Sequence, residues 1–228
     1  MTMENVIFNK INAVLRIVFS FMLDTVIPAD VEIRHIEQLS PEEFVLRACE
    51  GCTPHKNGTK DDVISLFSYK NEIVRKALVE IKDRPNRKIA SILGRLLYEG
   101  LISELPVRAF PYLVLPIPIT RAKRRERGWN QCELILKGLV RADRGKSFDV
   151  RTDVLKKIRA TEDQVGKSRA ERFENVKHSF AVEYADAVRD RHVIIFDDIL
   201  TTGATLADAH RAVTEAGAAH VICVSMAR

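Results

Sequence analysis

The chain has 228 residues, of which 46% are hydrophobic and 29% are charged, and its formal net charge is +5. This composition allows a sizeable core and is normal for a soluble protein, and this length suits one α/β domain with an appendage or two small domains. The positive excess is modest, but it is concentrated at residues 121–127, RAKRRER, which hold five cations and one anion.

The first predicted element is a helix over residues 11–24, where apolar residues recur at helical spacing. Arg16 and Asp24 interrupt this stretch, so its unbroken apolar run is far shorter than the roughly 20 residues that span a bilayer. We therefore expect an amphipathic helix that packs on the body of the protein, and no membrane span.

Residues 30–60 are irregular in pattern. We expect a short strand over residues 31–36, VEIRHI, and a helix that opens at residues 40–43, because a serine, a proline and two acidic residues are typical of a helix start. The polar, turn-rich residues 55–62, HKNGTKDD, mark the best boundary. We predict an N-terminal appendage over residues 1–60 and a main domain over residues 61–228.

The four cysteines indicate reduced thiols. Cys49 and Cys52 form one C-x-x-C pair, while Cys132 and Cys223 stand alone. One pair supplies only two of the four ligands that a structural zinc ion needs, so we do not expect zinc. Unpaired thiols are typical of a reducing compartment, which predicts a cytoplasmic protein.

The main domain alternates helical and apolar segments. Residues 112–119, YLVLPIPI, form a continuous apolar run typical of a strand buried on both faces, and Pro116 and Pro118 should end its pairing. A basic loop should follow at residues 121–127. The other expected helices are 71–82, 87–99, 132–142 and 205–216, and the other expected strands are 153–159, 180–184, 193–196 and 221–226. This order predicts an α/β fold with an open, mainly parallel sheet flanked by helices.

The most informative stretch is VIIFDDILTTGATL, residues 193–206. In such sheets ligands bind beyond the carboxyl ends of the strands, where Asp197 and Asp198 stand. Backbone N–H groups of a glycine turn at a helix start bind anions, and threonine hydroxyls add donors. Two carboxylates repel a phosphate but accept hydrogen bonds from a ribose diol. The stretch therefore predicts a ribose 5-phosphate site, with the diol at the aspartates and the phosphate at Thr201, Thr202, Gly203, Ala204 and Thr205.

This stretch resembles the signature of the type I phosphoribosyltransferases, which bind phosphoribosyl pyrophosphate (PRPP). Further segments resemble the competence protein F family, also described as predicted amidophosphoribosyltransferases. The matching residues are Pro116, Pro118, Arg125, Arg127, Gly128, Asn130 and Gln131, then Thr161, Gln164, Arg172, Asn175 and Phe180, and also Tyr69, Lys70 and Lys82. The resemblance covers roughly residues 65–228. It departs at the front, where the family's four-cysteine zinc module is reduced to one pair, and at Lys167, where the family more often has an apolar residue.

The resemblance implies a PRPP site with Mg²⁺, which Asp197 and Asp198 would hold together with PRPP. It also implies a pyrophosphate loop with Arg125, Arg127, Gly128 and Asn130. Residues 160–178 would form a mobile active-site loop whose candidate contacts are Gln164, Lys167, Arg172 and Asn175. Many members of the superfamily dimerise, so a homodimer is a further expectation.

The function stays open between two classes. The favoured one is a PRPP-dependent, Mg²⁺-dependent transferase of unknown acceptor, linked by resemblance to competence and DNA uptake. The alternative is a non-catalytic protein of this fold that binds single-stranded DNA, because the five cations of residues 121–127 stand beside Trp129. A solvated basic surface without a ligand is the simplest account of the same residues.

Overall fold

The computed structural model describes residues 31–49, 63–106, 111–159 and 178–228. The chain separates into two compact units, Met1–Gln38 and Leu39–Arg228. The predicted helix over residues 11–24 lies outside the described residues. The predicted boundary between residues 60 and 61 also falls where the chain is not described, so it stays a prediction.

The described part of the first unit is a helix, α2 (Val31–Gln38). The strand predicted over residues 31–36 is therefore wrong. Ile33 and Ile36 are both buried, and their spacing of three residues puts them on one face of a helix. In a strand the same spacing would turn them to opposite faces.

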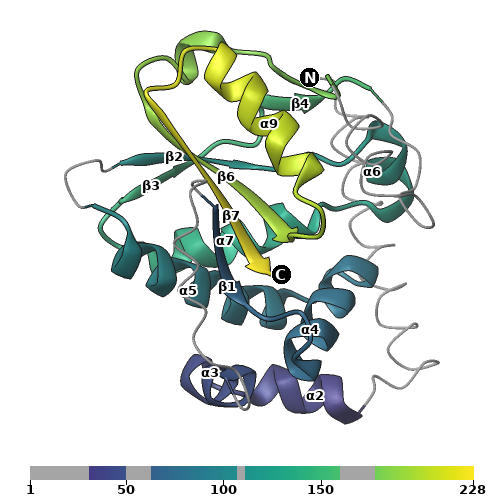
Figure 1. The fold of residues 1–228 in the computed structure, drawn as a ribbon. Helices are drawn as coiled ribbons and strands as arrows, with labels where there is room; N and C mark the ends of the chain where they lie inside the picture. The colour runs from purple at the N-terminus through teal and green to yellow at the C-terminus, as the bar shows by residue number, and fades with distance from the viewer. Residues whose placement is uncertain (1–30, 50–62, 107–110, 160–177) are drawn as a thin grey trace, which may run out of the picture. The chain divides into compact units, whose positions relative to one another are not determined.

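The second unit is built on a parallel sheet of five strands (Figure 1). The strand order is β1-β7-β6-β2-β3, and every neighbouring pair is parallel. The strands are β1 (Val63–Phe67), β2 (Tyr112–Pro116), β3 (Phe148–Val150), β6 (His192–Ile199) and β7 (His220–Ala227). The predicted fold class is confirmed, and β1 and β3 are additions to the predicted strands.

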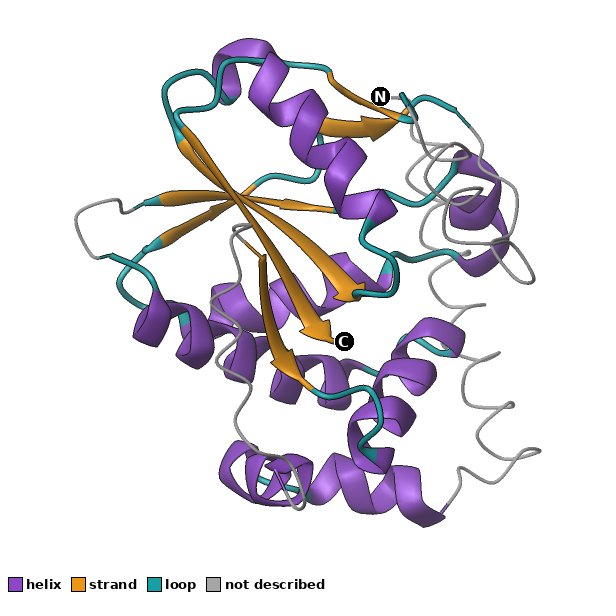
Figure 2. Ribbon diagram, in the orientation of Figure 1, coloured by secondary structure: helices purple, strands orange, loops and turns teal. Residues whose placement is uncertain are grey.

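Helices flank this sheet, as Figure 2 shows in purple against the orange strands. Helix α9 (Ala204–Glu215) lies on one face, while α5 (Arg87–Glu104) and α7 (Gln131–Ala142) lie on the other (Figure 1). Helices α3 (Pro41–Cys49) and α4 (Glu72–Asp83) complete this side of the unit. The predicted helices over residues 71–82, 87–99, 132–142 and 205–216 are confirmed, although α5 runs five residues further than expected.

Side chains on both faces of the central strands are buried, as the continuous apolar runs predict. Leu113, Leu115 and Ile195 pack in one core with residues of α9. Val114 and Ile194, which alternate with them along the same strands, are also fully buried. The sheet is therefore a rigid base, and the residues that follow its strands are held in fixed positions.

Local signals start the helices where the sequence predicts. The Ser40 hydroxyl accepts from the Glu43 N–H at 3.1 Å, and the Glu43 carboxylate accepts from the Ser40 N–H at 2.7 Å. This reciprocal capping box satisfies two donors at the start of α3. Asn71 and Asn86 cap α4 and α5 in the same sense, because the side-chain oxygen of each accepts from first-turn N–H groups.

Two shorter parts of the chain lie outside the main sheet: a pair of strands and a short helix. Strands β4 (Leu155–Lys157) and β5 (Phe180–Val182) pair antiparallel, where the sequence predicts two strands. The prediction of a loop over residues 121–127 is wrong, because this segment is helix α6 (Arg121–Arg127). Thr120 caps its start, Gly128 ends it with a φ of 86°, and alanine, arginine, lysine and glutamate are good helix formers.

None of the helices described by the structure combines the length and the hydropathy needed to cross a membrane.

Candidate functional site

The candidate site lies along the edge of the sheet that is formed by the carboxyl ends of its strands, next to the inner strands β2 and β6. The two strands pair in parallel with Pro116 opposite Phe196, where β2 ends, while β6 continues to Ile199 beside β7. The N–H of Ile117 donates to the Phe196 carbonyl at 2.8 Å, which is the last bond before the chain leaves β2. Asp197 and Asp198 follow at once on β6 and therefore lie at this edge, as predicted.

The segment between β6 and α9 forms the predicted turn. Gly203 adopts a φ of 82° and stands at the start of α9, where the described part of the chain provides no N-cap side chain. The turn residues Thr201 and Thr202 are exposed and half-buried, respectively. The N–H of Ala204 donates to the Thr202 hydroxyl at 3.4 Å. Apart from this long contact, the described residues provide no side-chain cap here, so the other backbone donors of the first turn are open to a ligand, and the helix dipole favours an anion.

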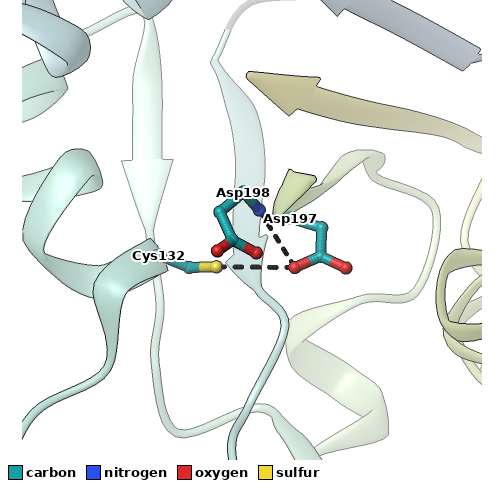
Figure 3. Close-up of side chains that lie close together, drawn as sticks. All are labelled: Cys132, Asp197 and Asp198. Atoms are coloured by element: carbon teal, nitrogen blue, oxygen red, sulfur yellow. Dashed lines mark hydrogen bonds between the residues drawn. The ribbon is translucent and has the colours of Figure 1, made fainter. Parts of the chain in front are cut away.

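The two carboxylates lie against a thiol (Figure 3). The Cys132 Sγ donates to Asp197 Oδ1 at 3.7 Å, and the Asp198 N–H donates to the same oxygen at 3.0 Å. Gln131 Nε2 donates to Asp198 Oδ2 at 3.2 Å. Cys132 and Gln131 lie in the first turn of α7, so the start of this helix packs against the two carboxylates.

Burial dominates the electrostatics of this cluster. It raises the pKa of Asp197 well above its usual range, and the neighbouring charge of Asp198 raises it further. Burial also raises the pKa of the Cys132 thiol, and the charges of Asp198 and Asp197 add to that effect. Each shift opposes a further negative charge, so the cluster favours a ligand that brings hydrogen-bond donors or a positive charge.

The four residues predicted as a pyrophosphate loop take different positions. Arg125 is exposed, Arg127 is half-buried, and Gly128 ends α6. Asn130 is only 1% exposed and has a structural part: its amide nitrogen donates to the Ile117 carbonyl, and its oxygen accepts from the Cys132 N–H, both at 2.9 Å. Asn130 therefore ties the end of β2 to the start of α7.

A hollow of about 1070 Å³ lies between α6 and the β4–β5 pair. Arginine and lysine side chains from both elements line it, and two of them are paired with glutamates: Arg124 with Glu133 at 2.9 Å, and Lys156 with Glu183 at 3.1 Å. The cations of its lining are Arg121, Arg124, Arg125, Lys156 and Lys157. Arg125 is thus the one residue of the predicted pyrophosphate loop among the lining side chains of this hollow.

Lys157 lines the hollow and also interacts electrostatically with Asp197. Burial lowers the pKa of Lys157, the charge of Lys123 lowers it too, and the charge of Asp197 acts in the opposite sense. Its Nζ lies 5.6 Å from the centre of the Phe180 ring. Neither Lys157 nor Cys132 could be predicted as a site residue, because each comes near the carboxylates through packing rather than through a local motif.

The residues predicted as mobile-loop contacts, Gln164, Lys167, Arg172 and Asn175, lie outside the described residues. The chain is described again from His178, and there it is firmly held. Asp208 of α9 accepts hydrogen bonds from the backbone N–H groups of His178, Ser179 and Phe180 at 2.9, 2.7 and 3.1 Å.

Comparison with known proteins agrees with this geometry. Residues 136–228 match the phosphoribosyl transferase domain family. The parallel sheet and the matched domain together define the type I phosphoribosyltransferase fold. Homologues named competence protein F and ComFC confirm the resemblance to the competence protein F family.

Three relatives illustrate the match. DNA utilization protein YhgH of Escherichia coli K12 is 32% identical over 147 residues, which are 62% of this chain and 61% of the relative. Competence protein F of Haemophilus influenzae is 26% identical over 60% of this chain and 59% of its own length. Competence protein ComFC of Bacillus subtilis is 24% identical over 78% of this chain and 70% of its own. The match thus spans about three fifths of the first relatives.

Two solved structures illustrate the matches by shape. A hypoxanthine phosphoribosyltransferase from Staphylococcus aureus superposes with a TM-score of 0.36 and 13% identity, over 64% of this chain and 69% of that chain. The allosteric regulatory enzyme of purine biosynthesis gives a TM-score of 0.37 and 21% identity, over 60% of this chain and 26% of that chain. Because likeness at this level is weak, the fold assignment depends on the sheet topology and the matched domain.

Proposed function

We propose that the chain binds PRPP together with Mg²⁺ and transfers its phosphoribosyl group to an acceptor that the sequence does not identify. The observation that carries this proposal is the pairing of two features at one strand end. Asp197 and Asp198 lie near the carboxyl end of β6, and the turn with Gly203 at a φ of 82° leads directly into α9. Carboxylates and a helix start are suited to different parts of one ligand.

The ribose 5-phosphate is bound by these two features. The turn Thr201–Thr205 surrounds the phosphate with backbone N–H groups and threonine hydroxyls, and the α9 dipole favours its charge. The carboxylates of Asp197 and Asp198 accept hydrogen bonds from the two ribose hydroxyls. Burial and the neighbouring carboxylate disfavour the charge of Asp197. Hydrogen bonds donated by the ribose hydroxyls would therefore stabilise this carboxylate.

The pyrophosphate lies toward the cationic hollow. Arg125 and Lys157 line it, and Lys157 also interacts with the charge of Asp197. Cations on one side of the site and carboxylates on the other orient PRPP with its leaving group toward α6. Arginine is well suited to this task, because its planar fork of donors matches phosphate oxygens.

The paired carboxylates also fit Mg²⁺, because this ion prefers oxygen ligands and is commonly bound by one or two carboxylates together with substrate phosphates. When bound, the ion would neutralise charge on the departing pyrophosphate. The chain itself positions ribose C1 for attack and stabilises the leaving group with fixed cations. In the reaction the bond from C1 to pyrophosphate breaks and a bond from C1 to the acceptor forms, so no side-chain nucleophile is needed.

Calorimetric titration with PRPP and Mg²⁺ tests the binding step. We expect saturable binding by the wild-type chain and its loss in the double variant Asp197→Asn/Asp198→Asn. A PRPP-dependent screen for pyrophosphate release across purines, pyrimidines and amines then tests transfer. Wild-type protein that gives no binding signal would refute the proposal, and so would a double variant that binds as the wild type does.

A second candidate function is binding of single-stranded DNA. The observation that favours it is the cationic lining shared by α6 and β4, with five arginine and lysine side chains around one hollow. The relatives' names refer to competence and DNA utilization. Phosphate contacts make such binding steeply salt-dependent. We expect oligonucleotide affinity to fall with salt and with the double variant Arg121→Ala/Arg125→Ala. Affinity that resists both changes would exclude this surface.

A further inference from the structure

A sulfur atom that the proposed PRPP chemistry does not use lies next to the two carboxylates of the site. One ligand atom each from Cys132, Asp197 and Asp198 lies within 4.8 Å of the other two (Figure 3). The thiol comes from the start of α7 and the carboxylates from the end of β6, so the rigid sheet and helix hold them together. Cys132 is 1% exposed and Asp198 is 8% exposed.

This donor set differs from the one that Mg²⁺ prefers. Mg²⁺ takes oxygen ligands in octahedral geometry and keeps several waters, so a buried sulfur adds nothing for it. Zinc is bound by cysteine sulfur and by aspartate oxygen, usually with four ligands in a tetrahedron. One thiol beside two carboxylates therefore favours a thiophilic divalent ion over Mg²⁺.

Gln131 provides an independent observation at the same place. Its side chain is 9% exposed, and its Oε1 is buried without a hydrogen-bond partner among the described residues. The Nε2 of the same amide donates to Asp198 Oδ2 at 3.2 Å, which places the amide beside the carboxylate. Buried polar atoms are nearly always satisfied, so an unpartnered oxygen here points to a missing ligand. Because the amide nitrogen faces Asp198, a water bound to a cation at the three neighbouring residues would satisfy this oxygen.

We propose that Cys132, Asp197 and Asp198, assisted by Gln131, bind a thiophilic divalent cation such as Zn²⁺ when no PRPP is present. The proposed ligands include neither cysteine of the C-x-x-C pair, Cys49 and Cys52. The cation occupies the carboxylates that would accept the ribose hydroxyls, so the ion and PRPP exclude each other. The second statement rests on the proposed function, whereas metal binding itself does not.

Cobalt titration tests the metal site directly, because a bond from cysteine sulfur to Co²⁺ gives a charge-transfer absorption. The full chain is used in a Cys49→Ser/Cys52→Ser background, so that the other pair does not contribute. We expect the absorption to appear on titration and to be reversed by Zn²⁺. It should be lost in both Cys132→Ala and Cys132→Ser, the second of which preserves side-chain size. The matched control is Cys223→Ala, at a buried cysteine of β7, which should keep it.

Zinc affinity gives the magnitude. Loss of a direct ligand should weaken Zn²⁺ binding by at least the roughly 10–100-fold that loss of an outer-shell partner causes. Absence of the cobalt absorption would overturn the proposal, as would an absorption that persists in both Cys132 variants.

Competition with PRPP separates this inference from the proposed function. Zn²⁺ should raise the apparent Kd of PRPP with Mg²⁺ for the wild-type chain and much less for Cys132→Ala, a comparison that corrects for zinc bound by PRPP in solution. Equal effects on both proteins would overturn the exclusion. If PRPP fails to bind even without Zn²⁺, the proposed function fails, while the cobalt absorption still decides the metal site.

Discussion

The carboxylate of Asp208 on α9 accepts the backbone N–H of Ser179 at 2.7 Å, and both residues are buried. This bond belongs to a set, because the same carboxylate also accepts the N–H groups of His178 and Phe180 and the Nε–H of Arg211. The anchored residues lead into β5 and directly follow the segment predicted as a mobile loop. One side chain of the helix that follows the Gly203 turn therefore holds the chain in place from His178 onward.

The first prediction is that Asp208→Asn destabilises the fold by about 2–4 kcal/mol. The variant replaces a charged acceptor with an amide whose nitrogen faces backbone donors, and each hydrogen bond to a charged group contributes about 1.5–3 kcal/mol. Urea unfolding measures the change. Asp153→Asn is the matched control, because Asp153 pairs with Arg151 at the surface, where such pairs contribute about 0–1 kcal/mol. Equal losses in the two variants would contradict the anchoring part of Asp208.

The second prediction concerns the contact between α5 and α7. A Cβ on Gly94 would lie 2.3 Å from the Ile135 carbonyl oxygen and 2.5 Å from the Gly138 Cα, and neither of these backbone atoms can move alone. Gly94→Ala should therefore push the helices apart and cost about 3 kcal/mol, the upper end of the usual cost of overpacking. Thermal and urea unfolding measure it.

Gly145→Ala is the control for this substitution. Among the residues that the structure describes, its Cβ would meet nothing closer than the Ser147 hydroxyl at 3.5 Å, so the stability should change by no more than about 0.5 kcal/mol. Wild-type stability in Gly94→Ala would mean that the two helices are not packed as closely as described.

The turn between β6 and α9 could be predicted from the sequence because its parts are contiguous. Asp197, Asp198 and Gly203 lie within seven residues, and one strand end and one helix start position all of them. The parallel sheet could be predicted equally well, because runs such as residues 193–196 are apolar without the alternation of a half-exposed strand. Strand β3 has only three residues, too few to show any periodicity, and its neighbour in the sheet rather than its sequence makes it a strand.

The rest of the site depends on contacts between distant segments. Cys132 and Asp197 are 65 residues apart and meet only because α7 starts beneath the end of β6. Lys157 reaches the same place through the pairing of β4 with β5. Helix α6 was missed for a different reason: it has no apolar face, so periodicity gives no signal, and the Thr120 cap and helical propensity specify it.

The third prediction tests the turn as a phosphate site. Gly203→Ala must place an alanine at a φ of 82°, which costs roughly 1–2 kcal/mol, and relief of that strain moves the backbone donors of the turn. We expect PRPP affinity to fall about tenfold or more, equivalent to about 1.4 kcal/mol. Calorimetric titration with PRPP and Mg²⁺ measures this change.

Gly217→Ala is a matched control, because Gly217 has a φ of 95° at the other end of α9. It should lose similar stability and keep wild-type PRPP affinity. If the two variants lose the same affinity, the turn has no specific part in binding.

The fourth prediction is a dependence of stability on pH that comes from Asp197. Burial, and then the charge of Asp198, raise the pKa of Asp197 in the folded chain above its value in the unfolded chain. The folded chain therefore keeps this proton when the unfolded chain has lost it. Its contribution to stability is fully present below the unfolded pKa of about 3.9 and is lost as the pH rises through the folded pKa.

Asp197→Asn removes this titration, because an amide does not ionise. We expect the variant to gain stability relative to the wild type as the pH rises from about 4 to about 8, and to be the more stable protein at neutral pH while losing PRPP. Urea unfolding at a series of pH values measures the difference between the two proteins. Asp186→Asn, at a side chain that is 91% exposed, controls for the substitution itself. If the free energy of unfolding changes with pH in parallel for the wild type and Asp197→Asn, the buried carboxylate does not destabilise the fold. A functional role would then not be needed to explain why an aspartate occupies this position.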